Sequence, residues 1–229
     1  MTVEILFSHS GAMFAYYLGI AEVLKEYDLS DVVFSATSGG CFPCILLNTG
    51  KDIRTTFNNM LDYIENNNNS WENIIKGFLT ENITDEDIEL LNKKFCCKLT
   101  KLNSFLLPEK VSVDEWNNKE DFVQCIGAAC FVPLMCGNKF YTEYRNEKVI
   151  DGFFSGTSSI PVTTNKVLHF HPNMWRTVNP TWLLPSTDKQ WLKALYELGY
   201  MDALNHKSEF EGTLKMKTQK EIITQNDSV

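Results

Sequence analysis

A serine stands in a turn between two apolar segments, the setting that a nucleophile elbow requires. Val32–Phe34 is a short β-type run, and Phe42–Leu47 is predicted to form a buried helix. Small residues lie on both sides of Ser38 in the turn between them, namely Ala36, Gly39 and Gly40. Such a turn brings backbone close to the serine, so the positions two before and two after it must be small. The helix also directs its N-terminal amides at the serine, which favours a developing anion there. The alternative is an ordinary βα turn in which Ser38 caps the helix.

A carboxylate far along the chain is the second candidate. Asp151 follows a predicted hairpin, Lys139–Tyr144 and Lys148–Ile150, and precedes Gly152. Asp-Gly at the end of a strand is also simple turn chemistry, which is the alternative interpretation. The carboxyl ends of parallel strands are where such sheets collect their sites. We therefore expect Asp151 to lie beside Ser38.

The elements that must position these two residues alternate between strands and helices. A strand at Val3–Phe7 precedes an amphipathic helix from Met13 to about Tyr27, and the strand and helix of the elbow follow. This order predicts a parallel sheet with right-handed crossovers. Neither an internal repeat nor a linker interrupts the chain, so we expect one domain over residues 1–229. Further helices are predicted at 52–66, 71–78, 85–94, 122–130 and 191–204, and further strands at 98–102, 110–113 and 167–171.

Composition excludes several classes of protein. The chain has 229 residues, of which 44% are hydrophobic and 22% charged, as in an ordinary globular domain. A net charge of −8 argues against a nucleic-acid partner and against electrostatic docking onto anionic lipid. The N-terminus lacks the features of a signal peptide, and no apolar run approaches the roughly 18 residues of a membrane span. The seven cysteines, including adjacent Cys96 and Cys97, are expected to be reduced thiols. We expect a cytoplasmic protein that is not secreted, with any contact to membranes or lipid droplets peripheral and mainly hydrophobic.

Three stretches, in order, resemble the patatin-like phospholipase family. Phe7–Ile20 is similar to its opening strand, glycine-rich oxyanion loop and first helix, and Ser35–Gly40 is similar to its nucleophile elbow. Cys125–Pro133, followed by Lys148–Phe153, is similar to its helix ending in proline and its Asp-Gly-Gly/Ala motif. The resemblance covers about residues 3–161 and is strongest to the animal branch that includes adipose triglyceride lipase and adiponutrin.

The resemblance implies a three-layer α/β/α sandwich with a mainly parallel sheet. It also implies hydrolysis of carboxylic esters of phospholipids or acylglycerols at a membrane or lipid surface, through an acyl-enzyme. Ser38 would be the nucleophile and Asp151 its general base, forming a Ser-Asp dyad. The implied oxyanion donors are Ser10, Gly11, Ala12 and Gly39, and the remaining elbow and motif positions are Ala36, Gly40 and Gly152.

Residues 162–229 fall outside the resemblance. We expect them to pack on the domain, with a frayed tail after about residue 215. No calcium loop is visible, so neither a metal nor another cofactor is expected. Apolar residues that could line an acyl groove, or simply belong to the core, are Phe42, Leu46, Phe153 and Phe154.

Two departures from the family pattern leave room for an alternative, a catalytically weak or inactive patatin-like protein that binds lipid. The family loop is Gly-Gly-Gly-x-Arg/Lys-Gly, and the aligned residues here run from His9 to Phe14. Side chains restrict the positive φ angles that glycine adopts freely. The residue after Asp151-Gly152 is Phe153 rather than Gly or Ala.

Two other chemistries compete with a Ser-Asp dyad. His169 and His171 lie two apart on a predicted strand and share one face, so one of them could serve Ser38 in a Ser-His-Asp esterase. Cys41 and Cys44 form a C-x-x-C at a helix start, which resembles a thioredoxin-like redox site. The elbow already occupies that turn, which disfavours the redox interpretation.

Overall fold

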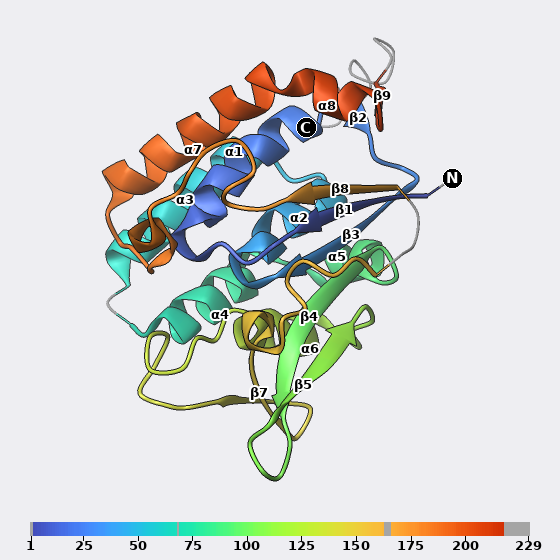
Figure 1. Ribbon diagram of the computed structural model, residues 1–229. Coiled ribbons are helices and arrows are strands. Elements are labelled where there is room, and N and C mark those ends of the chain that lie inside the picture. The colour runs from blue at the N-terminus through green and yellow to red at the C-terminus, as the bar shows by residue number, and fades with distance from the viewer. Residues whose placement is uncertain (1, 68, 163–165, 218–229) are drawn as a thin grey trace.

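The computed structural model describes residues 2–67, 69–162 and 166–217. A mixed sheet forms the centre of this part of the chain (Figure 1). Its strands are β1 (Val3–Phe7), β3 (Val32–Thr37), β4 (Phe95–Leu102), β5 (Pro108–Val113), β6 (Thr142–Tyr144), β7 (Glu147–Asp151) and β8 (Lys166–Phe170). Their order is β6-β7-β4-β3-β1-β8, and β5 pairs with β4. The central strands β4, β3, β1 and β8 run parallel, and the others are antiparallel to their neighbours. The predicted α/β class with parallel central strands is confirmed.

The helices are α1 (Phe14–Leu24), α2 (Cys41–Thr49), α3 (Ile53–Asn66), α4 (Trp71–Asn82), α5 (Asp85–Leu91), α6 (Lys119–Ala129), α7 (Lys189–Asn205) and α8 (Lys207–Glu211). All except the short α8 lie where hydrophobic periodicity predicted a helix. Five of them begin at side chains that accept a hydrogen bond from the first turn, which are Asp52, Ser70, Thr84, Asn118 and Asp188. These caps satisfy backbone donors that a helix leaves without partners.

One face of the sheet is apolar and is covered by helices. Phe7, Ala36 and Cys97 are paired across β1, β3 and β4, so their side chains share this face. The Phe7 ring lies 5.1 Å from the Tyr17 ring of α1, and the Cys97 sulfur lies 3.8 Å from the Cys41 sulfur of α2. Helices α1 and α2 therefore bury this face, and the elbow connects strand β3 to the covering helix α2.

The opposite face carries buried polar side chains that hold the segment after β7 over the sheet. Ser35 Oγ donates to Glu4 Oε1 at 2.5 Å, and Lys98 Nζ donates to Ser35 Oγ at 3.2 Å. Lys98 Nζ also donates to Ile160 O at 2.6 Å, and Val162 N donates to the Glu4 carboxylate at 3.0 Å. Buried charges are tolerated where such partners satisfy them. The outer layer here includes the 3-10 helix η3 (Gly152–Ser155) and its following loop, whereas longer helices cover the apolar face.

Helix α1 is buried on nearly all sides, whereas its sequence predicts one polar face. Every residue of α1 except Glu22 is buried, and α7 lies along it (Figure 1). Gly19 permits this approach, because a Cβ there would overlap the Tyr196 carbonyl oxygen. A buried hydrogen bond of 2.6 Å from Tyr16 Oη to Asp202 Oδ2 joins the two helices. The segment beyond the family resemblance thus contributes α7 to the main hydrophobic core.

A second, two-stranded sheet lies near the end of the described residues. Strand β9 (Lys215–Met216) pairs antiparallel with β2 (Tyr27–Asp28). This pairing holds the residues at which the sequence predicted a frayed tail to begin. Residues 218–229, which make up most of that predicted tail, lie outside the described residues.

The hairpin of β6 and β7 turns through two residues with positive φ. Arg145 and Asn146 have φ angles of 48° and 62° and connect the paired residues Tyr144 and Glu147. Positive φ at both central residues is typical of the type I′ turn, whose twist matches that of the two strands. Strand β7 leaves this turn and ends at Asp151.

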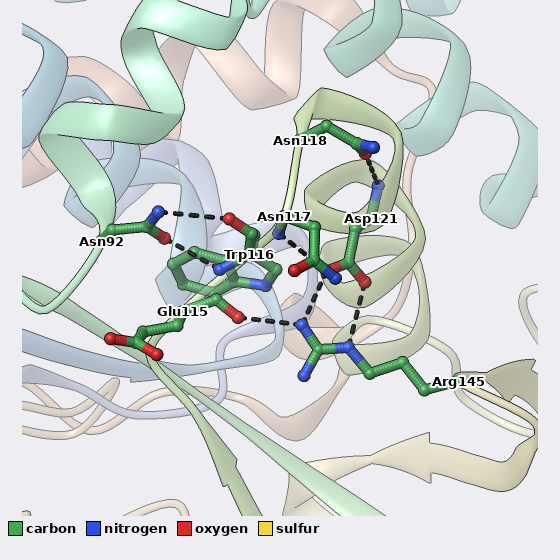
Figure 2. A network of polar contacts seen from close by, with 7 residues as sticks. All are labelled: Asn92, Glu115, Trp116, Asn117, Asn118, Asp121 and Arg145. Carbon is green, nitrogen blue, oxygen red and sulfur yellow. Dashed lines mark hydrogen bonds and ion pairs between the residues drawn. The ribbon is translucent and has the colours of Figure 1, made fainter.

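The Arg145 guanidinium anchors this turn to the start of α6 (Figure 2). Its Nη2 and Nε donate to the two Asp121 oxygens at 2.6 and 3.1 Å, and Nη2 also donates to Glu115 O at 2.9 Å. The Asp121 carboxylate further accepts from Asn117 N at 3.0 Å. The Asp121 side chain is only 13% exposed, so this ion pair is partly shielded from water. The network fixes the hairpin whose second strand carries Asp151.

Replacing Arg145 with glutamine is expected to lower the free energy of unfolding by about 1–2 kcal/mol, because Asp121 would keep its charge and lose its two-point partner. Urea denaturation followed by circular dichroism measures the effect. Arg54→Gln is a matched control, since both guanidinium groups lie 5.0 Å above a tyrosine ring. The partner of Arg54 is Glu197, which is 55% exposed, so its loss should cost less than about 0.5 kcal/mol. Equal losses in the two variants would contradict the anchoring role.

Candidate active site

Ser38 lies at a strained bend between β3 and α2. Its φ angle is 59°, which a residue with a Cβ adopts at a cost of about 1–2 kcal/mol, and its side chain is buried. The two positions after it must be glycine because neighbouring atoms leave no room for a Cβ. A Cβ at Gly40 would lie 2.6 Å from the carbonyl oxygens of Phe7 and Ser8, and one at Gly39 would overlap Ser10 Oγ. Ala36, two residues before the serine, is fully buried within β3. The elbow geometry expected from the small residues is present.

Asp151 lies beside Ser38, at the end of β7. Ser38 and Asp151 line the same cavity, and the Ser38 hydroxyl lies close enough to the Asp151 carboxyl group to lower its pKa. Phe153 N donates to Asp151 Oδ1 at 2.9 Å. Gly152 allows the close approach of this turn, because a Cβ there would overlap the Lys98 carbonyl oxygen of β4. The structure thus brings together the two residues that were predicted from distant segments.

The route by which Asp151 arrives differs from our expectation of a parallel strand. Strand β7 is antiparallel to β4, and Asp151 pairs with Leu99 in the middle of β4. Strand β4 continues past Lys98, which pairs with the last residue of β3, and this overhang binds the hairpin. The carboxylate therefore reaches the elbow from a strand running in the opposite direction.

Burial dominates the electrostatics of Asp151. Loss of solvent raises its pKa to about 6, although the nearby Ser38 hydroxyl and the hydrogen bond from Phe153 N offset part of the rise. The side chain is 1% exposed. A carboxylate with a pKa near 6 is still ionised at pH 7 and is a stronger base than an ordinary aspartate.

The loop after β1 supplies backbone amides near Ser38. The 3-10 helix η1 (Gly11–Met13) and the 3-10 helix η2 (Ser38–Gly40) both begin without a side-chain cap. Of the four predicted oxyanion donors, Gly11, Ala12 and Gly39 line the cavity described below, whereas Ser10 is buried outside its lining. Uncapped N–H groups at the start of a helix are suited to bind an anion.

The departures of this loop from the family pattern do not create backbone strain. Gly11, which is retained, has a φ of 51°, and a Cβ there would overlap the Leu183 carbonyl oxygen. Phe14 has a φ of −53°, and His9 is not among the described residues with positive φ. The glycine is therefore kept at the one position of the loop that requires it.

Ser38 and Asp151 share an apolar cavity of about 380 Å³. Three of the four residues proposed for an acyl groove line it, namely Phe42, Phe153 and Phe154. Leu46 does not line this cavity and belongs to the hydrophobic core. The other side chains that enclose the cavity are mostly aliphatic or aromatic, so it suits a hydrocarbon chain.

Much of the cavity wall could not be recognised in the sequence. Helices α3 and α4 contribute Met60, Ile64, Trp71, Ile74, Ile75 and Phe78, whose helical spacing predicts only a core-facing stripe. Leu183–Ser186 close another side from the segment outside the resemblance. His9 also lines the cavity, and in the sequence only its place in the predicted oxyanion loop pointed to it.

The two competing chemistries find little support in the geometry. His169 Nε2 lies 2.7 Å from Ser8 Oγ, and its ring lies 5.3 Å from the His171 ring, so this histidine is engaged away from Ser38. Cys41 and Cys44 are fully buried, and burial raises the pKa of both thiols well above the usual value. Reactive redox thiols need a lowered pKa and access to solvent.

Within the described ranges, no cluster of three His, Cys, Asp or Glu side chains could hold a metal ion. In the same part of the chain, none of the helices has both the length and the apolar character needed to cross a membrane.

Two curated transacylases resemble the chain. The omega-hydroxyceramide transacylase of Mus musculus is 29% identical over 98 residues, which is 40% of this chain and 16% of that protein. Its Homo sapiens counterpart is 28% identical over 94 residues, which is 41% of this chain and 17% of that protein. The matched segment thus spans well under a fifth of the length of either relative. No family model matches the chain.

Two solved structures are similar to the chain. VipD from Legionella pneumophila has a TM-score of 0.44 and 13% identity, covering 73% of this chain and 49% of that one. The ExoU–SpcU complex from the type III secretion system of Pseudomonas aeruginosa has a TM-score of 0.44 and 16% identity, covering 90% of this chain and 51% of that one.

Proposed function

We propose that the chain is a patatin-like lipid acyl hydrolase that cleaves carboxylic esters of phospholipids or acylglycerols. The observation that carries this proposal is that Ser38, at a strained strand-to-helix bend, and the buried Asp151 lie together in one apolar cavity. A hydroxyl beside a carboxylate of raised pKa is suited to nucleophilic attack, and the cavity is suited to an acyl chain. The finer placement in the branch of adipose triglyceride lipase and adiponutrin stays a prediction.

The proposed reaction has two halves. Ser38 Oγ attacks the ester carbonyl carbon as Asp151 accepts its proton, and the oxyanion is bound by N–H groups of Gly11, Ala12 and Gly39. Asp151 then returns the proton to the leaving alcohol oxygen, which leaves an acyl-serine. In the second half a water molecule gives its proton to Asp151 and attacks the acyl-serine. The carboxylic acid departs and the serine regains its proton.

The acyl group could also pass to an alcohol instead of water. The matched relatives are named transacylases, and an acyl-enzyme in an apolar cavity can react with any hydroxyl that reaches it. We place hydrolysis first because the dyad itself does not require a second lipid, and the acceptor can be tested directly.

The test is to incubate the protein with phospholipid and acylglycerol and to measure released fatty acid and newly formed ester by mass spectrometry. We expect fatty acid release that persists in a chelator. New ester formed only when a long-chain alcohol is added would assign the chain to acyl transfer. Lipid binding without either product would favour the alternative of a lipid-binding protein.

The substrate surface is proposed to meet the cavity rim. Met135, Phe153, Phe154 and Leu184 line the cavity and are 42–51% exposed, so the apolar lining continues to the outside. With a net charge of −8, a neutral or zwitterionic lipid surface fits this rim better than an anionic one. Lipid esters would reach Ser38 without leaving an apolar environment.

Replacing both Met135 and Leu184 with glutamine is expected to lower hydrolysis of phosphatidylcholine in vesicles about tenfold, because less apolar surface enters the lipid. Hydrolysis of a soluble short-chain ester should stay within about threefold of wild type, since the elbow is untouched. The matched control is Leu90→Gln with Met201→Gln, whose side chains are 51% and 52% exposed and do not line the cavity. An equal loss in the control pair would contradict a role for the rim.

A further inference from the structure

His9 is a polar side chain in a cavity that is otherwise largely apolar. It lines the same cavity as Ser38 and Asp151, and it is the first residue of the predicted oxyanion loop. The ring lies 4.5 Å from the Phe153 ring, at an interplanar angle of 53°. The Ser-Asp chemistry described above gives this histidine no role.

Ser158 contacts both the backbone and the ring of His9. His9 N donates to Ser158 Oγ at 2.7 Å, and Ser158 Oγ lies 2.7 Å from His9 Nδ1. The hydroxyl accepts from the backbone N–H and still has its own hydrogen to give, and we assign this hydrogen to a bond with Nδ1. In the neutral imidazole the proton then lies on Nε2. Burial lowers the pKa of His9, so the ring is neutral at pH 7.

The segment that carries Ser158 is itself held in place. Ser8 Oγ donates to Ser158 O at 3.2 Å, and Thr157 Oγ1 donates to Gly152 O at 2.9 Å. The turn after Asp151 therefore holds Ser158, and Ser158 in turn orients the His9 ring. The His9 ring contacts Ser158 through Nδ1 and packs against the tilted Phe153 ring, so its second nitrogen is directed away from Ser158.

We propose that His9 Nε2–H donates a hydrogen bond to the ester undergoing cleavage, as a donor additional to the backbone amides. This inference rests on the proposed hydrolase function. A donor held in advance within an apolar cavity stabilises developing charge strongly, and the loss of one such donor typically lowers kcat by about 10²–10³-fold. The side chain at position 9 thereby supplies an interaction that a glycine in the family loop could not.

Kinetics of two substitutions test the donor. His9→Phe keeps a ring against Phe153 and removes the N–H, whereas His9→Gln places an amide N–H near the position of Nε2. We expect kcat to fall about 10²-fold in His9→Phe with KM within about threefold, and to stay within about tenfold of wild type in His9→Gln. The proposal is overturned if His9→Phe keeps wild-type kcat or if His9→Gln is as impaired as His9→Phe.

A pH profile separates a donor from a base. If His9 is a donor, the rise in activity near pH 6, which we assign to ionisation of Asp151, should be unchanged in both variants. Disappearance of that rise in His9→Phe would make His9 the base and would overturn its role as a donor.

The tautomer can be measured without any activity. Nitrogen-15 NMR of the imidazole should show a protonated Nε2 and an unprotonated Nδ1 in wild type, and a changed tautomer balance in Ser158→Ala. A protonated Nδ1 in wild type overturns the inference whatever the kinetics show. Wild type with the expected tautomer and no hydrolysis that depends on Ser38 would overturn the proposed function, and with it the donor role. Active wild type beside fully active His9→Phe would overturn this inference alone.

Discussion

Replacing Ser38 with alanine is expected to lower kcat for ester hydrolysis by at least about 10³-fold, because the acyl-enzyme can no longer form. The variant should fold. Its side chain differs from serine by one oxygen, and the surrounding β3, α2 and η1 keep their contacts. The rate is to be measured on a soluble short-chain ester, so that binding to a lipid surface does not affect the result.

A fluorophosphonate probe tests the same role of Ser38 without a substrate. Wild type should be labelled on Ser38, and Ser38→Ala should remain unlabelled. Ser38→Gly serves as a structural control, since glycine adopts the φ of 59° without a Cβ clash. It should be as inactive as the alanine variant and more stable than it by about 1 kcal/mol in urea denaturation. Labelling of Ser38→Ala, or ester hydrolysis by this variant at the wild-type rate, would contradict the assignment of Ser38 as the nucleophile.

Replacing Asp151 with asparagine is expected to abolish turnover and to stabilise the protein at neutral pH. Asparagine keeps an oxygen that accepts the hydrogen bond from Phe153 N, but it cannot take the Ser38 proton. The pKa of Asp151 is about 6 in the folded protein and 3.8 in its ordinary state, so the folded protein holds this proton more tightly. Stability therefore falls as pH rises from about 4 to about 6, and the penalty is full above that window. Removing the buried charge should add up to about 3 kcal/mol at pH 7 and almost nothing below pH 4.

The activity of wild type should follow the same ionisation in the opposite direction. The general base works only when deprotonated, so kcat/KM should rise with pH through about 6 and then level off. Asp202→Asn is a control of opposite sign. Burial raises the pKa of Asp202, but hydrogen bonds from Arg176 and Tyr16 outweigh that and lower it. Its charge therefore stabilises the fold above pH 3.8, and the asparagine variant should be less stable at pH 7. Equal stability changes in the two variants would contradict the account of Asp151.

The sequence predicted the parts of this fold that depend on local patterns. Val3–Phe7 and Val32–Phe34 are apolar runs of strand length, and the small residues around Ser38 require a tight bend whatever lies around them. The direction of β7 could not be predicted, because it depends on an overhang of β4 that no residue of the hairpin indicates. The extent of α1 burial was also missed, since it depends on extensive contact with α7, which lies far along the chain. The proton position that we assign on His9 depends on Ser158, which is 149 residues away in the chain.

The Leu183 carbonyl lies against Gly11 and begins a stretch of cavity wall that could determine which acyl chains fit. The wall formed by Leu183–Ser186 belongs to a connection between β8 and α7, and neither the bend at Ser38 nor the hairpin carrying Asp151 includes any of its residues. Substitutions at 184–186 can therefore reshape the space for an acyl tail while the reacting groups stay where they are. In the proposed hydrolase, part of the preference for fatty-acid length would therefore depend on a stretch of chain that is separate from the reacting groups.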